Sequence, residues 1–106
     1  MSVEDLDIID FISTNKAGDI VLTISDHLEW NKNNKHLIIL QDKLNRYLEF
    51  IATGQLEKEY QQLKNQRIII NIVLKFKPNQ DADIFFKKVE EKIKASGYFF
   101  SLKIIP

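Results

Sequence analysis

The sequence contains no cysteine, and this absence excludes several classes of protein. Disulfide bonds, thiolate nucleophiles and thiolate metal centres all require that residue. The remaining composition, 44% apolar and 28% charged, is that of an ordinary globular protein and is too apolar for a disordered chain. We therefore expect a cytoplasmic protein without disulfide bonds.

Long hydrophobic runs are also missing from the chain. No apolar stretch approaches the roughly 18 residues that a membrane-spanning helix needs. Residues 1–5 are acidic and lack the basic and apolar regions of a signal peptide. No membrane association is expected, and the 106 residues are predicted to form a single domain, residues 1–106, with one core.

Neither sign of charge is in excess, since 15 basic residues balance 15 acidic ones. Nothing in the overall charge therefore points to nucleic acid or to an anionic membrane. The two halves differ, because residues 1–57 carry a net charge of −5 and residues 58–106 a net charge of +5. Either the halves neutralise each other within one fold, or the molecule is dipolar and associates with itself or with a charged partner.

Strand-like alternation is the clearest pattern that is present. In residues 67–77, one parity is wholly apolar (Ile68, Ile70, Ile72, Leu74 and Phe76) and the other is mixed. Successive side chains of a strand point to opposite faces, so one face should pack on a core and the other should meet water or a partner. Residues 6–14 and 20–25, joined by a turn at 15–19, predict an antiparallel hairpin, and residues 98–105 predict the last strand.

Two segments have helical periodicity. Residues 36–52 carry apolar side chains at three- and four-residue steps, with Asn33 or Asn34 as a possible cap and Gly54 at the end. A second helix should follow Pro78, capped by Asn79, and should end before Gly97. Residues 57–66 are a polar connection that has room for a helical turn.

The element order ββαβαβ predicts an α+β fold, a two-layer sandwich in which two helices cover one face of a four-stranded mixed sheet. The opposite face, called the free face below, would present Val21, Thr23, Ile69, Asn71, Val73, Phe99, Ser101 and Lys103. This set is more apolar than a solvated sheet face requires. We expect the free face, or an edge strand beside it, to form a homodimer interface or to bind another protein.

The candidates for chemistry are concentrated in residues 23–30, TISDHLEW, where Asp26, His27, Glu29 and Trp30 form a candidate interaction corner. In an extended chain Ser25 and His27 share a side and Asp26 points away, so these residues do not make a nucleophilic triad. Asp26, His27, Glu29 and His36 offer oxygen and nitrogen ligands, but no helical pair of histidines is present. No metal site, no other cofactor and no catalytic residue is predicted.

Lysines are clustered in the C-terminal half at positions 75, 77, 87, 88, 92 and 94. Sheets that bind single-stranded RNA stack bases on several exposed aromatic side chains. Phe99 is the one aromatic side chain predicted on the free face. Nucleic-acid binding is therefore not expected.

Several segments resemble a family of small bacterial proteins that is classed as a domain of unknown function. They are residues 10–16 (DFISTNK), 21–30 (VLTISDHLEW), 40–45 (LQDKLN), 47–51 (YLEFI) and Gly54. The resemblance covers essentially the whole chain and departs at residues 57–66, where proline and glycine are expected and neither occurs. It implies a stand-alone cytoplasmic bacterial domain with an adaptor or interaction role, and it implies no activity or substrate.

Two hypotheses of function follow from these patterns. In the first, the protein is a non-enzymatic interaction or self-associating domain that uses the free face and the corner at residues 26–30. In the second, it is a small-ligand binder or metal-dependent enzyme that uses Asp26, His27 and Glu29. The second hypothesis requires these three side chains to converge on a pocket, whereas a binding surface can be flat.

Overall fold

The computed structural model of the protein describes residues 11–30, 35–61 and 66–105. Its four strands are β1 (Phe11–Thr14), β2 (Ile20–Asp26), β3 (Ile68–Leu74) and β4 (Phe99–Ile104). The helices are α1 (Lys35–Ala52), α2 (Gln55–Glu59) and α3 (Gln80–Ala95). The predicted order ββαβαβ is confirmed, and the short α2 lies where the predicted polar connection begins.

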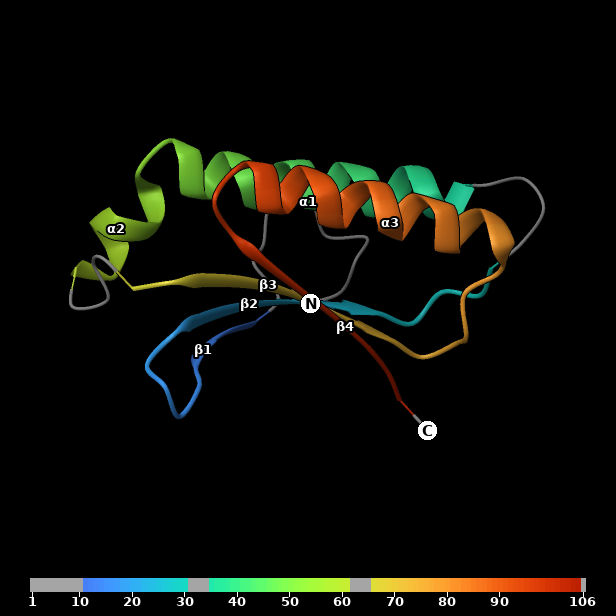
Figure 1. The fold of residues 1–106 in the computed structure, drawn as a ribbon, viewed down its shortest axis with the longest axis horizontal. Coiled ribbons are helices and arrows are strands. Elements are labelled where there is room, and N and C mark those ends of the chain that lie inside the picture. Colours follow the sequence, from blue (N-terminus) through green and yellow to red (C-terminus); the bar gives the residue numbers. More distant parts are fainter. Residues whose placement is uncertain (1–10, 31–34, 62–65, 106) are drawn as a thin grey trace.

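The sheet order is β1-β2-β3-β4. β1 pairs with β2 in the antiparallel sense, as the predicted hairpin requires, whereas β2, β3 and β4 run parallel to one another. Parallel neighbours need crossover connections, which α1 and α3 provide. Figure 1 shows both helices on the same side of the sheet, so the predicted two-layer sandwich with a mixed sheet is confirmed.

The core lies between the sheet and the helices that cover one of its faces. Ile20, Leu22 and Ile24 of β2 and Ile70, Ile72 and Leu74 of β3 are almost completely buried. The alternation in the sequence produces this arrangement, since every second side chain of each central strand points to α1 and α3. Tyr47 of α1 is also fully buried, and its hydroxyl donates a hydrogen bond of 2.6 Å to the carbonyl oxygen of Thr23.

The β1–β2 hairpin is closed by side chains as well as by its backbone. Asn15 Oδ1 accepts hydrogen bonds from the backbone N–H groups of Ala17 and Asp19, and Gly18 has a φ of 86°. The carboxylate of Asp19 in turn accepts from the guanidinium of Arg67 at 2.9 Å. The turn is thereby tied to the residue that precedes β3.

The predicted boundaries hold closely where the structure describes them. β3 and β4 are shorter than predicted by a few residues at their ends, and α1 begins one residue earlier than predicted. Asn79 caps α3, with its Oδ1 accepting from the N–H of Ala82 at 2.9 Å, as predicted. The predicted strand residues 6–10 and the predicted caps Asn33 and Asn34 lie outside the described residues.

Candidate functional site

The first candidate site lies at the carboxyl end of β2, where Asp26 continues the buried parity of the strand. Asp26 is 2% exposed and therefore lies under the helices. His36 lies in the first turn of α1, four residues before the buried Leu40, and is 3% exposed. The Nε2 atom of His36 is 2.5 Å from Oδ2 of Asp26. The chain reversal between β2 and α1 thus brings together two ionisable groups that are ten residues apart in sequence.

Both nitrogens of His36 have partners. Nδ1 is 3.2 Å from the carbonyl oxygen of Glu29, and a carbonyl oxygen only accepts, so Nδ1 carries a proton. Nε2 shares one further proton with Asp26, whose second oxygen, Oδ1, accepts from the N–H of Leu28 at 3.1 Å. No nitrogen of His36 and no oxygen of Asp26 is left without a partner to bind a metal or to accept a substrate proton.

Burial affects the proton affinity of Asp26. Removal of the carboxylate from water raises the pKa of Asp26 above its ordinary value of 3.8, because the interior disfavours the charged form. The hydrogen bonds from His36 and from the Leu28 backbone act in the opposite direction, and their effect on this pKa is smaller. The pair connects β2 to α1. Its burial also costs free energy, because both side chains are removed from water.

Trp30 covers the pair. Its ring is stacked on His36 with the ring centroids 3.7 Å apart, and it meets Phe86 of α3 edge to face at 5.9 Å. The indole N–H donates to the carbonyl oxygen of Phe76 at 3.1 Å. Trp30 therefore connects β2, α1 and the start of the β3–α3 connection, and it shields one end of the core.

The predicted corner is divided between interior and surface. Asp26 and Trp30 face the core, whereas His27 and Glu29 are exposed. Within the part of the chain that the structure describes, no three His, Asp or Glu side chains are grouped so that they could hold a metal ion.

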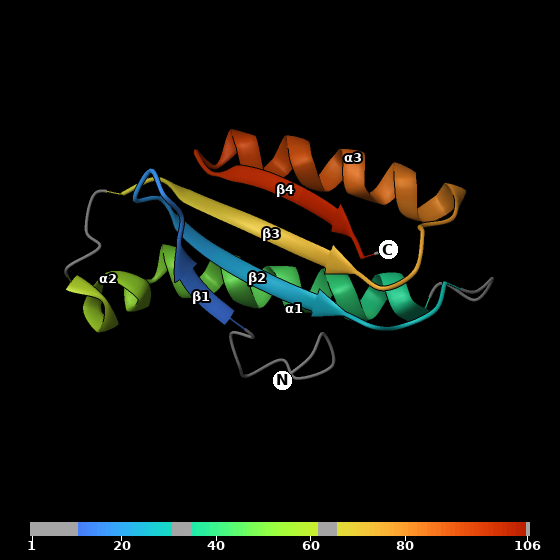
Figure 2. The same ribbon diagram turned by 90° about the horizontal axis from the view of Figure 1, so that it is seen from below.

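The second candidate site is the free face, which Figure 2 shows toward the viewer. The strand register places the predicted residues, together with Ser25, in three cross-strand rows, which are Val21–Ile69–Phe99, Thr23–Asn71–Ser101 and Ser25–Val73–Lys103. Phe11 of β1 extends the second row, opposite Thr23. The first row is entirely apolar and forms one continuous strip across β2, β3 and β4.

Two aromatic side chains of this face are strongly exposed. Phe11 is 59% exposed and Phe99 is 47% exposed. The guanidinium of Arg67 lies 5.5 Å from the centroid of the Phe99 ring while it binds Asp19. The apolar strip therefore ends at a charged pair. Aromatic groups beside arginine are common at the centres of protein interfaces.

Asn71, in the middle of the free face, is 8% exposed. Its Nδ2 donates a long hydrogen bond of 3.5 Å to Oγ1 of Thr23. Its Oδ1 is the one buried side-chain oxygen or nitrogen of the described residues that has no hydrogen-bond partner. A buried acceptor without a donor costs about 1–3 kcal/mol.

The sequence prediction did not identify His36 as the partner of Asp26, and it did not include Lys43 in the buried stripe of α1. Lys43 is completely buried, with its Nζ 5.8 Å from the centroid of the Tyr47 ring. Both residues follow the helical period of α1. The buried positions 36, 40, 43 and 47 are separated by four, three and four residues, which places them on one face of the helix. Lysine is rarely buried completely and histidine is buried only in some cases, so the sequence pattern alone did not place these two residues in the buried stripe.

Comparison with known proteins gives a family but no activity. A family model described as a family of unknown function (DUF6572) matches residues 1–106. No curated protein and no solved structure matches the chain. Among the helices of the described segments, none has both the length and the apolar character that a bilayer crossing requires.

Proposed function

This chain belongs to the family of unknown function DUF6572, and we propose that it is a non-enzymatic interaction domain that binds a second copy of itself through the free face. The observation that carries the proposal is the apolar strip Val21–Ile69–Phe99, on the face of the sheet opposite to α1 and α3. A cytoplasmic location in a bacterial cell is part of the same proposal.

The geometry of the buried corner supports a non-enzymatic role. Asp26 and His36 use all their polar atoms within the fold, and His27 and Glu29 lie at the surface. The alternative, an enzyme or ligand-binding protein that uses Asp26, His27 and Glu29, needs the three groups to converge. The described positions favour a structural role for Asp26.

The apolar strip favours a second copy as the partner, because an identical strip is complementary to it. A twofold axis across the strands, over the row Val21–Ile69–Phe99, places the strip of one copy on the strip of the other. Face-to-face packing of two sheets and self-complementary contact are both common in dimers.

The test is sedimentation equilibrium over a wide range of concentration, with Phe99→Ser as the variant. Burial of a half-exposed phenylalanine contributes about 1 kcal/mol, and a symmetric dimer contains two copies, so the variant should weaken the dimer by about 2 kcal/mol, or roughly 30-fold. Ile84→Ser is the matched control, because Ile84 is 49% exposed but lies on α3, in the other layer. It should leave the dimer unchanged.

Two results would contradict the proposal. A wild-type protein that stays monomeric at every concentration would exclude self-association. Equal weakening by Phe99→Ser and Ile84→Ser, with both variants folded by circular dichroism, would show that the free face is not the interface.

A further inference from the structure

The groove between α1 and α3 has an apolar floor. Its volume is about 210 Å³, and its apolar lining comes from both helices: Leu44, Leu48, Phe85, Val89 and Ile93. Leu44 and Ile93 are buried, and the other three are half-buried. A cavity of this size is larger than a single water molecule needs. A short aliphatic chain has this size.

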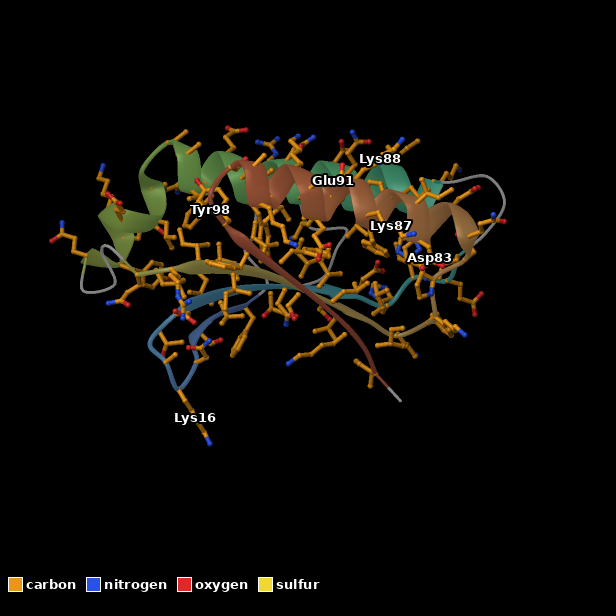
Figure 3. The ribbon with its side chains drawn as sticks, viewed as in Figure 1. Lys16, Asp83, Lys87, Lys88, Glu91 and Tyr98 are labelled. Carbon is orange, nitrogen blue, oxygen red and sulfur yellow. The ribbon has the colours of Figure 1, made fainter. Side chains whose placement is uncertain are left out.

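The rim of the groove is polar and carries one sign of charge. Gln41 and Asn45 of α1 line one side, and Lys88 and Lys92 of α3 line the other. Each pair is four residues apart, so its members lie on one face of their helix. The lining contains no acidic residue. Figure 3 shows Lys88 at the side of α3 that faces away from the sheet.

The opposite flank of α3 differs. There Lys87 lies with Asp83 and Glu90 beside β4, and Lys94 is 3.8 Å from Glu90. Asp83 and Lys87 lie close to each other below Lys88 in Figure 3. Lysines of that flank thus have acidic neighbours, whereas no ion pair between described residues involves Lys88 or Lys92. The lining of the groove thus carries positive charge and no negative charge, with Glu91 of α3 three residues after Lys88.

We propose that this groove binds a small amphiphilic anion, with a medium-chain carboxylate as the chemical class. The aliphatic chain would lie on the apolar floor, and the carboxylate would accept hydrogen bonds from the ammonium groups of Lys88 and Lys92. Gln41 and Asn45 add neutral amide donors on the α1 side. The site lies in the helix layer, away from the free face, so it does not depend on the proposed self-association.

The test is a titration of ¹⁵N-labelled protein, followed by ¹H–¹⁵N NMR, with octanoate as the probe. Octyltrimethylammonium has an alkyl chain of similar length with a positive charge, and acetate has the carboxylate without the chain. Octanoate should give saturable shifts at the amides of the groove residues. The affinities of the cation and of acetate should each be lower than that of octanoate by a factor of about ten or more. The cation lacks the charge attraction, and acetate lacks the apolar contact.

Matched double variants identify the site. Lys88→Gln with Lys92→Gln should weaken octanoate binding about tenfold, since two cations next to the carboxylate are lost. Lys87→Gln with Lys94→Gln removes the same charge from the other flank of α3 and should change the affinity by less than about twofold. The proposal is wrong if octanoate gives no saturable shifts in the groove, if the octyl cation binds equally well, or if the two double variants weaken binding alike.

Discussion

Asp26 and His36 show how two polar side chains can be buried without leaving an unsatisfied atom. Oδ1 of Asp26 accepts from the Leu28 backbone, Oδ2 faces Nε2 of His36, and Nδ1 of His36 faces the Glu29 carbonyl. A pair of ionisable side chains can be buried in a core when each of its polar atoms has a hydrogen-bond partner. The removal of either partner should leave the other buried without a hydrogen bond.

Substitutions at Asp26 test this role. Asp26→Ala should destabilise the protein by about 3 kcal/mol, since it leaves His36 without its partner. Asp26→Asn should cost about 1 kcal/mol, because its amide can donate to Nε2 of a neutral His36 and its oxygen can still accept from Leu28. Urea unfolding followed by the fluorescence of Trp30 measures both values. Equal losses in the two variants would contradict the role given to the hydrogen bonds.

The pH dependence of the Asp26→Asn effect has a defined sign. Burial raises the pKa of Asp26, so the folded protein holds this proton more tightly than the unfolded chain. The stability that the wild type has relative to Asp26→Asn should be largest below the unfolded pKa of about 3.8. It should decrease as the pH rises through the higher pKa of the folded state.

Asp19 provides a control of opposite sign. The hydrogen bonds from Asn15 and Arg67 lower the pKa of Asp19 below 3.8. The stability that the wild type has relative to Asp19→Asn should therefore be present above pH 4 or so and should be lost as the pH falls through the lower pKa of the folded state. Denaturant unfolding at a series of pH values measures both profiles, and two slopes of the same sign would contradict the assignment.

At the scale of the elements, α3 has the residues that are typical of a helix N-terminus and of a helix C-terminus. Asn79 accepts from the N–H of Ala82, Asp81 and Asp83 lie in the first turn, and Lys92 and Lys94 lie in the last. Gly97, with a φ of 90°, follows the helix and leads into β4. Each end is thus fixed by local chemistry, and the buried stripe Ala82, Phe86 and Ile93 determines which side of α3 faces the sheet.

The cap at Asn79 gives a prediction at this scale. Asn79→Ala removes the acceptor for the Ala82 N–H and should lower the free energy of unfolding by about 1 kcal/mol. Asn79→Ser keeps a side-chain acceptor at the cap position and should cost a few tenths of a kcal/mol at most. Denaturant unfolding of the two variants measures the difference. An Asn79→Ser variant as unstable as Asn79→Ala would show that the cap hydrogen bond is not the cause.

At the scale of the whole molecule, the sheet has two interior strands and two edges. β2 and β3 lie between neighbours, whereas β1 and β4 form the edges. The N–H of Ile105 donates to the carbonyl oxygen of Leu74, so by alternation the N–H groups of Phe100, Leu102 and Ile104 point to the outer edge. No described strand covers that edge.

Hydrogen exchange measured by NMR should reproduce this pattern. The amides of β2 and β3 should exchange most slowly, and those of Phe100, Leu102 and Ile104 should exchange quickly because they have no strand partner. The same measurement at high protein concentration separates two modes of association. Contact through the free face leaves these three amides fast, whereas protection that appears on them with concentration would show that the β4 edge is the interface.

The sequence by itself determined the elements and their faces. The alternation in residues 67–77 predicted that Ile70, Ile72 and Leu74 of β3 lie in the core, although it did not predict the burial of Asn71 on the other face. Asn79 and Gly97 predicted the ends of α3. These are local properties, since the period of a segment and the chemistry of its ends depend on residues that are neighbours in the chain. The composition of the free face followed from the same period.

The tertiary structure decided which elements are neighbours. The alternation of side chains along a strand places Asp26 on the core side of β2. It does not predict the parallel pairing of β2 with β3 or the position of His36 beside Asp26. The groove between α1 and α3 likewise depends on two helices that are separated by a whole strand in sequence. Contacts of this kind are set by the crossover connections and by packing of whole layers, so no local pattern contains them.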